Sequence, residues 1–144
     1  MPVPLRAPDP DLVRNAARVA RARGARVSVD LSSAAMIAAY DADAFRALVE
    51  QLEPAVVFGN AGEWRALGVD PRGWGADAVL KRGAQGCLFV RDGSAMELAV
   101  VPGDVRDVTG AGDALAAGYL VGGPERAMLT AAECVSQIGA QPAR

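Results

Sequence analysis

Apolar residues recur at the spacing of an α-helix between Asp9 and Gly24. Asp9 followed by Pro10 is typical of a helix start, because aspartate caps the first turn and proline suits the first helical position. Gly24 is a residue type that commonly follows a helix end. The pattern therefore predicts a first helix, and residues 26–30 then predict a short strand that ends in a carboxylate.

The next part of the chain contains one segment of undefined structure, followed by a predicted helix and a predicted strand. Residues 31–40 are small and predict no single structure. A second helix can be capped by Asp41 or Asp43, and Pro54 ends it. The apolar run at 55–58 is typical of a strand that is buried on both faces of a parallel sheet.

Turn residues and apolar runs predict the remaining elements. In order, these are a turn at 59–60, a short helix through 63–67, a loop at 68–76, a strand at 77–82, a hairpin of 87–90 and 95–101, and helices near 112–121 and 124–138. Three strands separated by helices, followed by a hairpin and two helices, indicate an α/β sheet with helices on its faces.

Composition narrows the classes of function. The 144 residues fit one domain, and half of them are hydrophobic, which is enough for a core. A net charge of −2, from 15 basic and 17 acidic residues, predicts no general attraction to nucleic acid or to an anionic membrane. No apolar stretch has the length of a membrane span or the form of a secretory signal, so we expect a cytoplasmic protein.

The residue types available for chemistry are restricted. Histidine is absent, which excludes histidine-based proton transfer and the usual zinc sites. Proton transfer then falls to a carboxylate, lysine, tyrosine or cysteine. The two cysteines, Cys87 and Cys134, have no CxxC spacing and predict a reducing compartment rather than a disulfide framework.

A glycine-rich segment precedes the first of the two C-terminal helices. The backbone N–H groups of Gly110, Ala111 and Gly112 would lie at the helix N-terminus, where unpaired donors and the helix dipole favour an anion. Asp113 falls in the first helical turn, beside this anion hole, and could accept a proton from an attacking hydroxyl. The alternative interpretation is a glycine-rich turn with a helix-capping aspartate.

The run Asp107-Val-Thr-Gly-Ala-Gly-Asp113 resembles the C-terminal signature of PfkB carbohydrate kinases, D-[TV]-T-G-A-G-D-A. The resemblance implies that Asp113 is the catalytic base for the acceptor hydroxyl. It also implies that Gly110, Ala111 and Gly112 bind the transferred phosphoryl group. Catalysis would then consist mainly of positioning and charge stabilisation.

Two further implications of the resemblance concern cations. Asp107 and Thr109 match positions of a monovalent-cation site for K⁺ in ribokinases, and the run 139–142 resembles the ribokinase ending whose carbonyls help to hold that ion. Asn60-Ala-Gly-Glu63 resembles the N-x-x-E motif that is linked to Mg²⁺ and phosphate. Its alternative interpretation is a helix cap with a glutamate in the first turn.

The remaining resemblances to the family mainly concern the nucleotide site. Lys81-Arg-Gly-Ala-Gln-Gly86 resembles a strand-end turn that lies along the nucleotide, with turn glycines at Gly83 and Gly86. Lys81 and Arg82 could neutralise phosphate charge or could form a solvated basic pair. Residues that would line the adenine pocket or pack in the helix core are Ala131, Ala132 and Val135. Asp30 resembles the aspartate of a family D-x-N stretch, but the asparagine is missing here.

The resemblance covers about residues 10–142 and only the C-terminal half of the family. It implies a ribokinase-like three-layer α/β/α fold with parallel strands and a hairpin, in which residues 1–144 form the nucleotide-binding and catalytic part. The N-terminal half, with the first strands, the lid and most sugar contacts, is missing. We therefore expect an open sheet edge and association, either as a homo-oligomer or with a chain that supplies the missing half.

The predicted activity is transfer of the γ-phosphoryl group of ATP to a hydroxyl of a small sugar, with Mg²⁺ and K⁺ as cations. A nucleoside kinase is the first alternative. A non-catalytic remnant that binds nucleotide or a partner chain is the second. A dinucleotide-binding oxidoreductase is disfavoured, because Gly110-Ala-Gly112 is not a G-x-G-x-x-G fingerprint and comes late in the chain.

Overall fold

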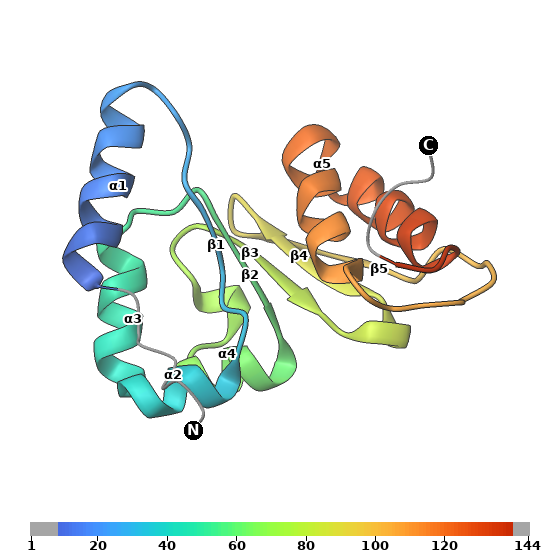
Figure 1. The fold of residues 1–144 in the computed structure, drawn as a ribbon, viewed down its shortest axis with the longest axis horizontal. Coiled ribbons are helices and arrows are strands. Elements are labelled where there is room, and N and C mark those ends of the chain that lie inside the picture. Colours follow the sequence, from blue (N-terminus) through green and yellow to red (C-terminus); the bar gives the residue numbers. More distant parts are fainter. Residues whose placement is uncertain (1–8, 140–144) are drawn as a thin grey trace.

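The computed structural model describes residues 9–139, which form a five-stranded sheet with helices on both faces (Figure 1). The helices are α1 (Pro10–Ala22), α2 (Ala34–Tyr40), α3 (Ala42–Gln51), α4 (Ala61–Leu67) and α5 (Ala111–Val135). The strands are β1 (Ser28–Asp30), β2 (Val56–Asn60), β3 (Asp77–Lys81), β4 (Cys87–Arg91) and β5 (Ser94–Leu98). Single 3₁₀ turns occupy Pro71–Gly73 and Gly83–Gln85.

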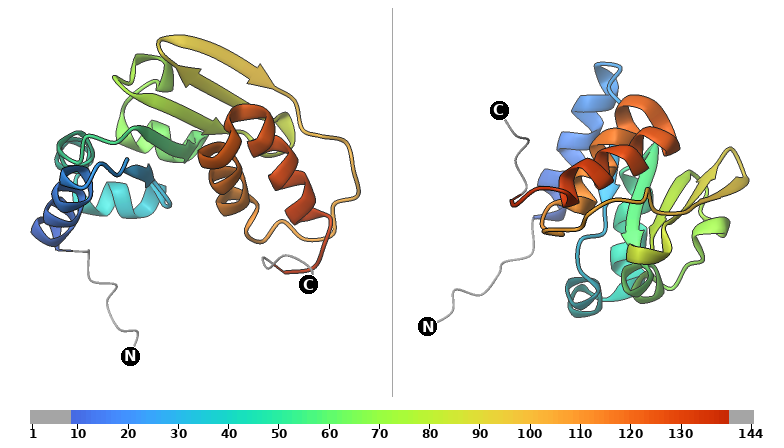
Figure 2. Two further views of the ribbon diagram at one scale, coloured as in Figure 1. Left: turned by 90° about the horizontal axis from the view of Figure 1, so that it is seen from above. Right: turned by 90° about the vertical axis from the view of Figure 1, so that its right-hand side faces the viewer.

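The spatial order of the strands is the same as their order in the chain. β1, β2 and β3 are parallel, and β4 and β5 complete the sheet in antiparallel directions. The helices α1 to α4 lie on one face and α5 lies on the other, as the views of Figures 1 and 2 agree. This is the predicted three-layer α/β/α architecture.

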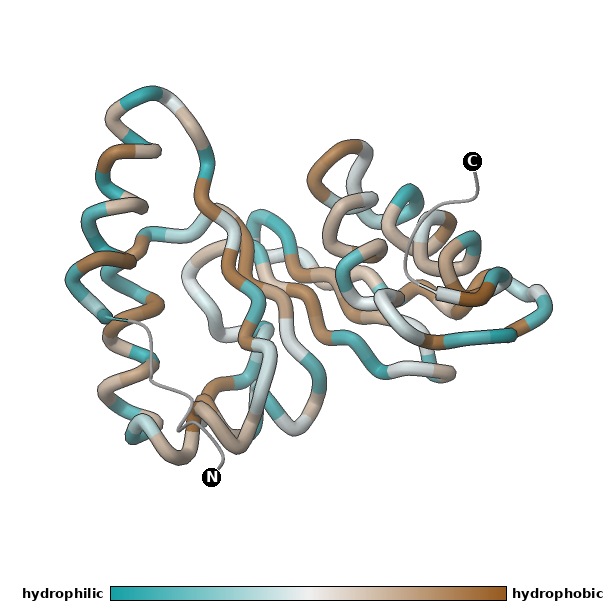
Figure 3. The backbone as a smooth tube through the Cα atoms, viewed as in Figure 1, coloured by the Kyte–Doolittle hydropathy of each residue, from teal (hydrophilic) through white to brown (hydrophobic). Residues whose placement is uncertain are grey.

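Alternation along the central strands gives each helical layer its own core. In β2, Val56 and Phe58 pack beneath α5, whereas Val57 packs beneath α2 and α4. Because both faces are covered, the strand is an unbroken apolar run. The hydropathy colouring of Figure 3 shows this concentration of hydrophobic positions along the central strands.

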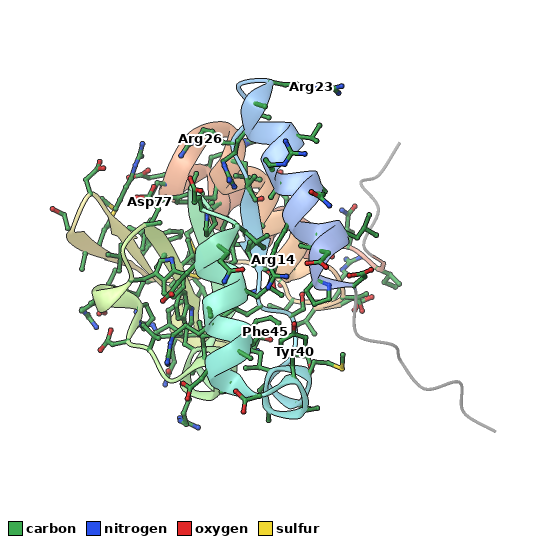
Figure 4. All side chains as sticks on the ribbon, turned by 90° about the vertical axis from the view of Figure 1, so that its left-hand side faces the viewer. Arg14, Arg23, Arg26, Tyr40, Phe45 and Asp77 are labelled. Carbon is green, nitrogen blue, oxygen red and sulfur yellow. The ribbon has the colours of Figure 1, made fainter. Side chains whose placement is uncertain are left out.

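The helices of the first layer are also joined to each other. Arg14 of α1 donates to Gln51 of α3 through Nε (2.6 Å). Tyr40 and Phe45 meet edge to face, with ring centroids 5.7 Å apart, where α2 gives way to α3 (Figure 4). These contacts connect α1, α2 and α3 into one layer.

An aromatic cluster attaches α5 to the sheet. Tyr119 stacks on Phe89 (5.8 Å between ring centroids) and meets Phe58 edge to face (5.5 Å). Its hydroxyl donates to Asp77 Oδ2 over 3.1 Å. Burial and the neighbouring Asp77 raise the pKa of Tyr119 to about 12, so the phenol remains a hydrogen-bond donor at neutral pH.

The structure corrects three sequence predictions. Residues 31–40 contain a helix, α2, which Ser33 caps by accepting from the N–H of Met36 (3.3 Å). The predicted turn at 59–60 is wrong, because both residues belong to β2 and Asn60 caps α4. The second hairpin strand ends at Leu98, and no regular element lies between 99 and 110.

The two C-terminal helices follow each other with little separation. They form one assigned element, α5, but Gly123 has the non-helical angles φ 78° and ψ −163°, and Pro124 follows it. The chain therefore bends there, and the two halves pack closely. A Cβ on Gly118 would lie only 2.7 Å from the carbonyl oxygen of Arg126.

One edge of the sheet is open, as predicted. Among the described residues, β1 pairs with β2 alone. Ser28 and Asp30 of this strand are exposed on the α5 side. Near the bend in α5, the side chains of Leu120 and Val121 are 58% and 85% exposed, which leaves apolar surface uncovered.

Candidate active site

Three polar residues end the three parallel strands. Asp30 ends β1, Asn60 ends β2 and Lys81 ends β3. Asn60 and Lys81 are register partners, so these strand ends lie side by side. In open α/β sheets, ligands bind outside the carboxyl ends of the parallel strands, which makes this edge the expected position of a site.

The glycine loop enters α5 beside this edge. Gly110 is the N-cap and has a left-handed conformation (φ 78°, ψ 0°), which glycine adopts without strain. No side chain of residues 9–139 caps the helix. The N–H of Ala111 donates to the carbonyl of Val108 (3.2 Å), whereas Gly112 and Asp113 lie in the first turn, where N–H groups have no acceptor within the helix. The donors that remain for an anion are therefore centred on Gly112.

Asp113 is the third residue of α5 and its side chain is exposed. Within residues 9–139, its carboxylate forms no ion pair. The positive end of the helix dipole stabilises a carboxylate in this position. Asp113 is thus an accessible proton acceptor beside the N–H groups of the loop.

The ammonium group of Lys81 lies between the strand ends and the glycine loop. Its Nζ is 2.8 Å from Asp30 Oδ2. A Cβ added to Gly112 would lie 3.4 Å from the same nitrogen, so Lys81 lies beside the start of α5. Arg82, by contrast, pairs with Glu97 of β5 (3.2 Å). Of the two basic residues that the sequence singled out, the structure brings Lys81 to the loop.

Asn60 and Glu63 form a reciprocal capping box at the start of α4. The two carboxylate oxygens of Glu63 accept from the N–H (2.7 Å) and the Nδ2 (2.8 Å) of Asn60, and Asn60 Oδ1 accepts from the N–H of Glu63 (2.9 Å). Glu63 is 5% exposed. This geometry is the one that the capping interpretation describes, and each carboxylate oxygen of Glu63 already accepts one hydrogen bond.

Asp107 connects the glycine loop to the end of α5. Its carboxylate accepts from the N–H of Thr109 (2.9 Å) and the N–H of Gly139 (2.9 Å). Hydrogen bonds from the hydroxyl and the N–H of Thr109, then from Gly139, lower the pKa of Asp107. The structure therefore gathers the predicted K⁺-site residues Asp107, Thr109 and Gly139, while 140–142 lie outside the described residues.

No metal centre is preassembled among residues 9–139. That part of the chain contains no group of three or more aspartate, glutamate or cysteine residues able to hold an ion together. The oxygen donors predicted for Mg²⁺ and K⁺ lie at two separate places, the capping box and the Asp107–Thr109 turn. Any Mg²⁺ would need ligands from water and from a bound phosphate, as is usual for this ion.

An apolar cavity of about 420 Å³ adjoins the glycine loop. The cavity is lined by the three residues predicted for an adenine pocket. Gly83 and residues from both ends of the irregular segment at 99–110 also line it. Figure 2 shows this segment running from β5 around the outside of the molecule to α5. A flat ring could enter the cavity while a phosphate chain reached Gly112. Some of its lining residues are Gly83, Val101, Met128, Ala131, Ala132 and Val135.

Two glycines form the turn beside this cavity. Gly86 has φ 80° and ψ −149°, and a Cβ there would lie 2.0 Å from the carbonyl oxygen of Leu98. Gly83 has φ 57° and lines the cavity. The turn predicted from both glycines is present, and at Gly86 the reason is close backbone contact.

Two features of the site have no clear signal in the sequence. Cys87 lines the cavity beside Lys81, and its burial raises the pKa of the thiol, so the group is protonated and unreactive. The pairing of Asp30 with Lys81 joins residues 51 positions apart. In the sequence, the one indication of this pairing is the position of each residue at the end of a predicted strand.

The sequence matches the pfkB family of carbohydrate kinases over residues 8–141. The signature loop, the strand ends and the adjoining cavity all lie within the matched residues. The chain belongs to the pfkB carbohydrate kinase family.

Solved structures agree with this assignment. The chain is 28% identical to adenosine kinase from Sinorhizobium meliloti, with a TM-score of 0.79 over 92% of this chain and 46% of that one. A probable sugar kinase from Rhizobium etli CFN 42 is 24% identical, with a TM-score of 0.79 over 90% and 45%. An uncharacterized sugar kinase from Pyrococcus horikoshii in complex with ATP is 20% identical, with a TM-score of 0.77 over 94% and 49%. The chain thus spans about half the length of the structures that it matches.

No helix within residues 9–139 combines the length and the apolar character needed to cross a membrane.

Proposed function

We propose that residues 1–144 form the nucleotide-binding and catalytic part of a kinase that transfers the γ-phosphoryl group of ATP to a hydroxyl of a small sugar. One observation carries the proposal. The ammonium of Lys81 and the N-terminus of α5 converge at Gly112, beside an apolar cavity and next to the exposed carboxylate of Asp113.

The chemistry assigns one role to each group. Asp113 accepts the proton of the acceptor hydroxyl as its oxygen bonds to the γ-phosphorus, and the bond to the β–γ bridging oxygen breaks to release ADP. The free N–H groups centred on Gly112 and the charge of Lys81 stabilise the negative charge on the transferred group. The cavity holds the adenine against Ala131, Ala132 and Val135.

The cations would occupy the two places already described. Mg²⁺ supplies charge neutralisation to the phosphates, and the Asn60–Glu63 box would hold its water shell from the end of β2. K⁺ would sit near Asp107 and Thr109, where it would steady the loop that precedes Gly110. The oxygen donors fit both ions, because carboxylate, amide and hydroxyl oxygens suit hard cations.

A nucleoside acceptor is the second candidate. The similarity to an adenosine kinase, at 28% identity, supports it. A nucleotide-binding remnant without activity is the third. The open β1 edge and the exposed Leu120 and Val121 favour association, with a second copy or with a chain that supplies the remaining half. The proposed location is the cytoplasm, with neither nucleic acid nor membrane as a partner.

Turnover of ATP by the chain over a panel of sugars and nucleosides tests the proposal. We expect acceptor-dependent ADP release that Asp113→Asn lowers by about 10²- to 10⁴-fold, the range of general-base catalysis. Asp43→Asn is the matched control, because Asp43 is also an exposed aspartate in the first turn of a helix, α3. ATP binding without turnover would support the remnant instead, and equal rates for wild type and Asp113→Asn would overturn the role of Asp113.

A further inference from the structure

The carboxylate of Asp30 is held in a fixed orientation by the chain that follows it. Its Oδ1 accepts from the N–H of Ser32 (2.9 Å) and lies 3.3 Å from the hydroxyl of the same residue. Ser32 has φ 59°, a left-handed conformation that is uncommon for a residue with a side chain. Oδ2 is thereby left to face Lys81.

Lys81 is the only lysine in the chain, beside 14 arginines. A lysine ammonium is a compact charge on a flexible stem, and it has three N–H donors. One donor goes to Asp30 Oδ2, and the nitrogen also lies close to Gly112, 3.4 Å from the position that a Cβ would take there. The side chain is 19% exposed and that of Asp30 is 30% exposed, so the pair is partly shielded from solvent.

We propose that Asp30 is a positioning residue of the phosphoryl-transfer site, whose carboxylate fixes the ammonium of Lys81 against the glycine loop. The two remaining N–H donors of Lys81 then face the phosphoryl group that the start of α5 binds. This inference rests on the proposed function. It gives Asp30 a role that requires no contact with the substrate.

The substitution Asp30→Asn separates positioning from general support of the fold. Asparagine keeps the shape and the acceptor for the Ser32 N–H, but it loses the charge that holds Lys81. The site also becomes more positive by one charge, so the KM for ATP should stay constant or fall. The kcat should fall by about 10- to 100-fold, the size expected when a charged hydrogen bond that orients a reacting group is lost.

The decisive experiment uses the whole chain labelled with ¹³C and ¹⁵N in lysine, which gives one side-chain signal for Lys81. The signal is recorded with and without MgATP for wild type, Asp30→Asn, Asp30→Glu and the control Asp43→Asn, and turnover is measured in parallel. We expect Asp30→Asn to shift the Lys81 signal in the free protein. We also expect it to lower kcat without raising the KM for ATP. Asp30→Glu should be intermediate, and Asp43→Asn should match wild type.

The outcomes separate this inference from the proposed function. If the Lys81 signal of free Asp30→Asn equals that of wild type, the pair does not order Lys81 and the inference fails. If MgATP shifts the Lys81 signal of the wild type, but wild type and Asp30→Asn have the same kcat, this inference fails and the proposed kinase function is retained. If MgATP leaves the wild-type signal unmoved, both fail, and the pair is only structural. If Asp30→Asn does not fold, equal kcat in wild type and Asp30→Glu would overturn the inference.

Discussion

Replacement of Gly118 by alanine should destabilise the protein, although alanine is the better helix former. A Cβ there would lie 2.7 Å from the carbonyl oxygen of Arg126, 2.7 Å from Thr130 Oγ1 and 2.9 Å from the Cα of Ala127. Two of these neighbours are backbone atoms, so the second half of α5 must move away. Overpacking typically costs about 1–3 kcal/mol, against a gain of about 1 kcal/mol in helix propensity. Because all three distances are below 3.0 Å, the cost should lie near the upper end of that range, and the expected net loss in the free energy of unfolding is about 2 kcal/mol.

Urea unfolding followed by the fluorescence of Trp64 and Trp74 measures this loss. The matched control is Gly73→Ala, because a Cβ on Gly73 has no neighbour within 4 Å and its φ is not positive. The control should stay within about 0.5 kcal/mol of wild type, as surface substitutions usually do. A Gly118→Ala protein as stable as wild type, or more stable, would refute the close packing of the two halves of α5.

Three further predictions concern the surroundings of the site. Tyr119→Phe should lower the free energy of unfolding by about 1 kcal/mol in urea, because it removes the hydrogen bond to Asp77 and leaves that carboxylate without the donor. The pKa of Asp107 is lowered in the folded protein, so its contribution to stability is present above about pH 4, the unfolded pKa, and is lost as the pH falls through the folded value. Thermal unfolding of Asp107→Asn should therefore depend less on pH below pH 4 than that of wild type, and identical acid profiles would contradict this. Gly86→Ala should disrupt the contact between the turn and β5, because its Cβ would lie 2.0 Å from the carbonyl oxygen of Leu98, and a circular-dichroism melting temperature equal to that of wild type would contradict this.

The elements with strong local signals were predictable from sequence. The capped first helix, the apolar run of β2 and the glycine loop depend on residues that lie close together in the chain. α2 was not predicted, because a run of small residues has little periodicity, and its formation depends on the burial of Ile37 against the rest of the layer.

Tertiary contacts explain the incorrect turn at 59–60. Glycine followed by asparagine is a common turn pair. In the structure, Gly59 instead stays within β2, where its missing Cβ leaves room for Leu31 (Cδ1 at 2.8 Å from an added Cβ) and Trp64 (Nε1 at 3.0 Å). Leu31 comes from a distant part of the chain, at the end of the first strand, so no local pattern indicates this packing.

The candidate site was likewise predictable from the sequence only in part. The order of residues in the glycine loop predicted Gly110–Asp113 as the start of a helix, and the structure agrees apart from one residue at its beginning. The sequence could not show that Lys81, rather than Arg82, reaches the loop, because alternation along β3 and the position of Glu97 on β5 decide this. It also could not show that both oxygens of Glu63 are engaged by Asn60.

The convergence of Lys81 and the start of α5 on a phosphate is tested most directly by comparing the affinities of the chain for ATP and adenosine by isothermal titration calorimetry. We expect ATP to bind at least about tenfold more tightly than adenosine, since charge-assisted hydrogen bonds to the phosphates contribute about 1.5–3 kcal/mol each. Lys81→Met should remove most of this difference. Equal affinities for ATP and adenosine in the wild type would contradict a phosphate site at Gly112.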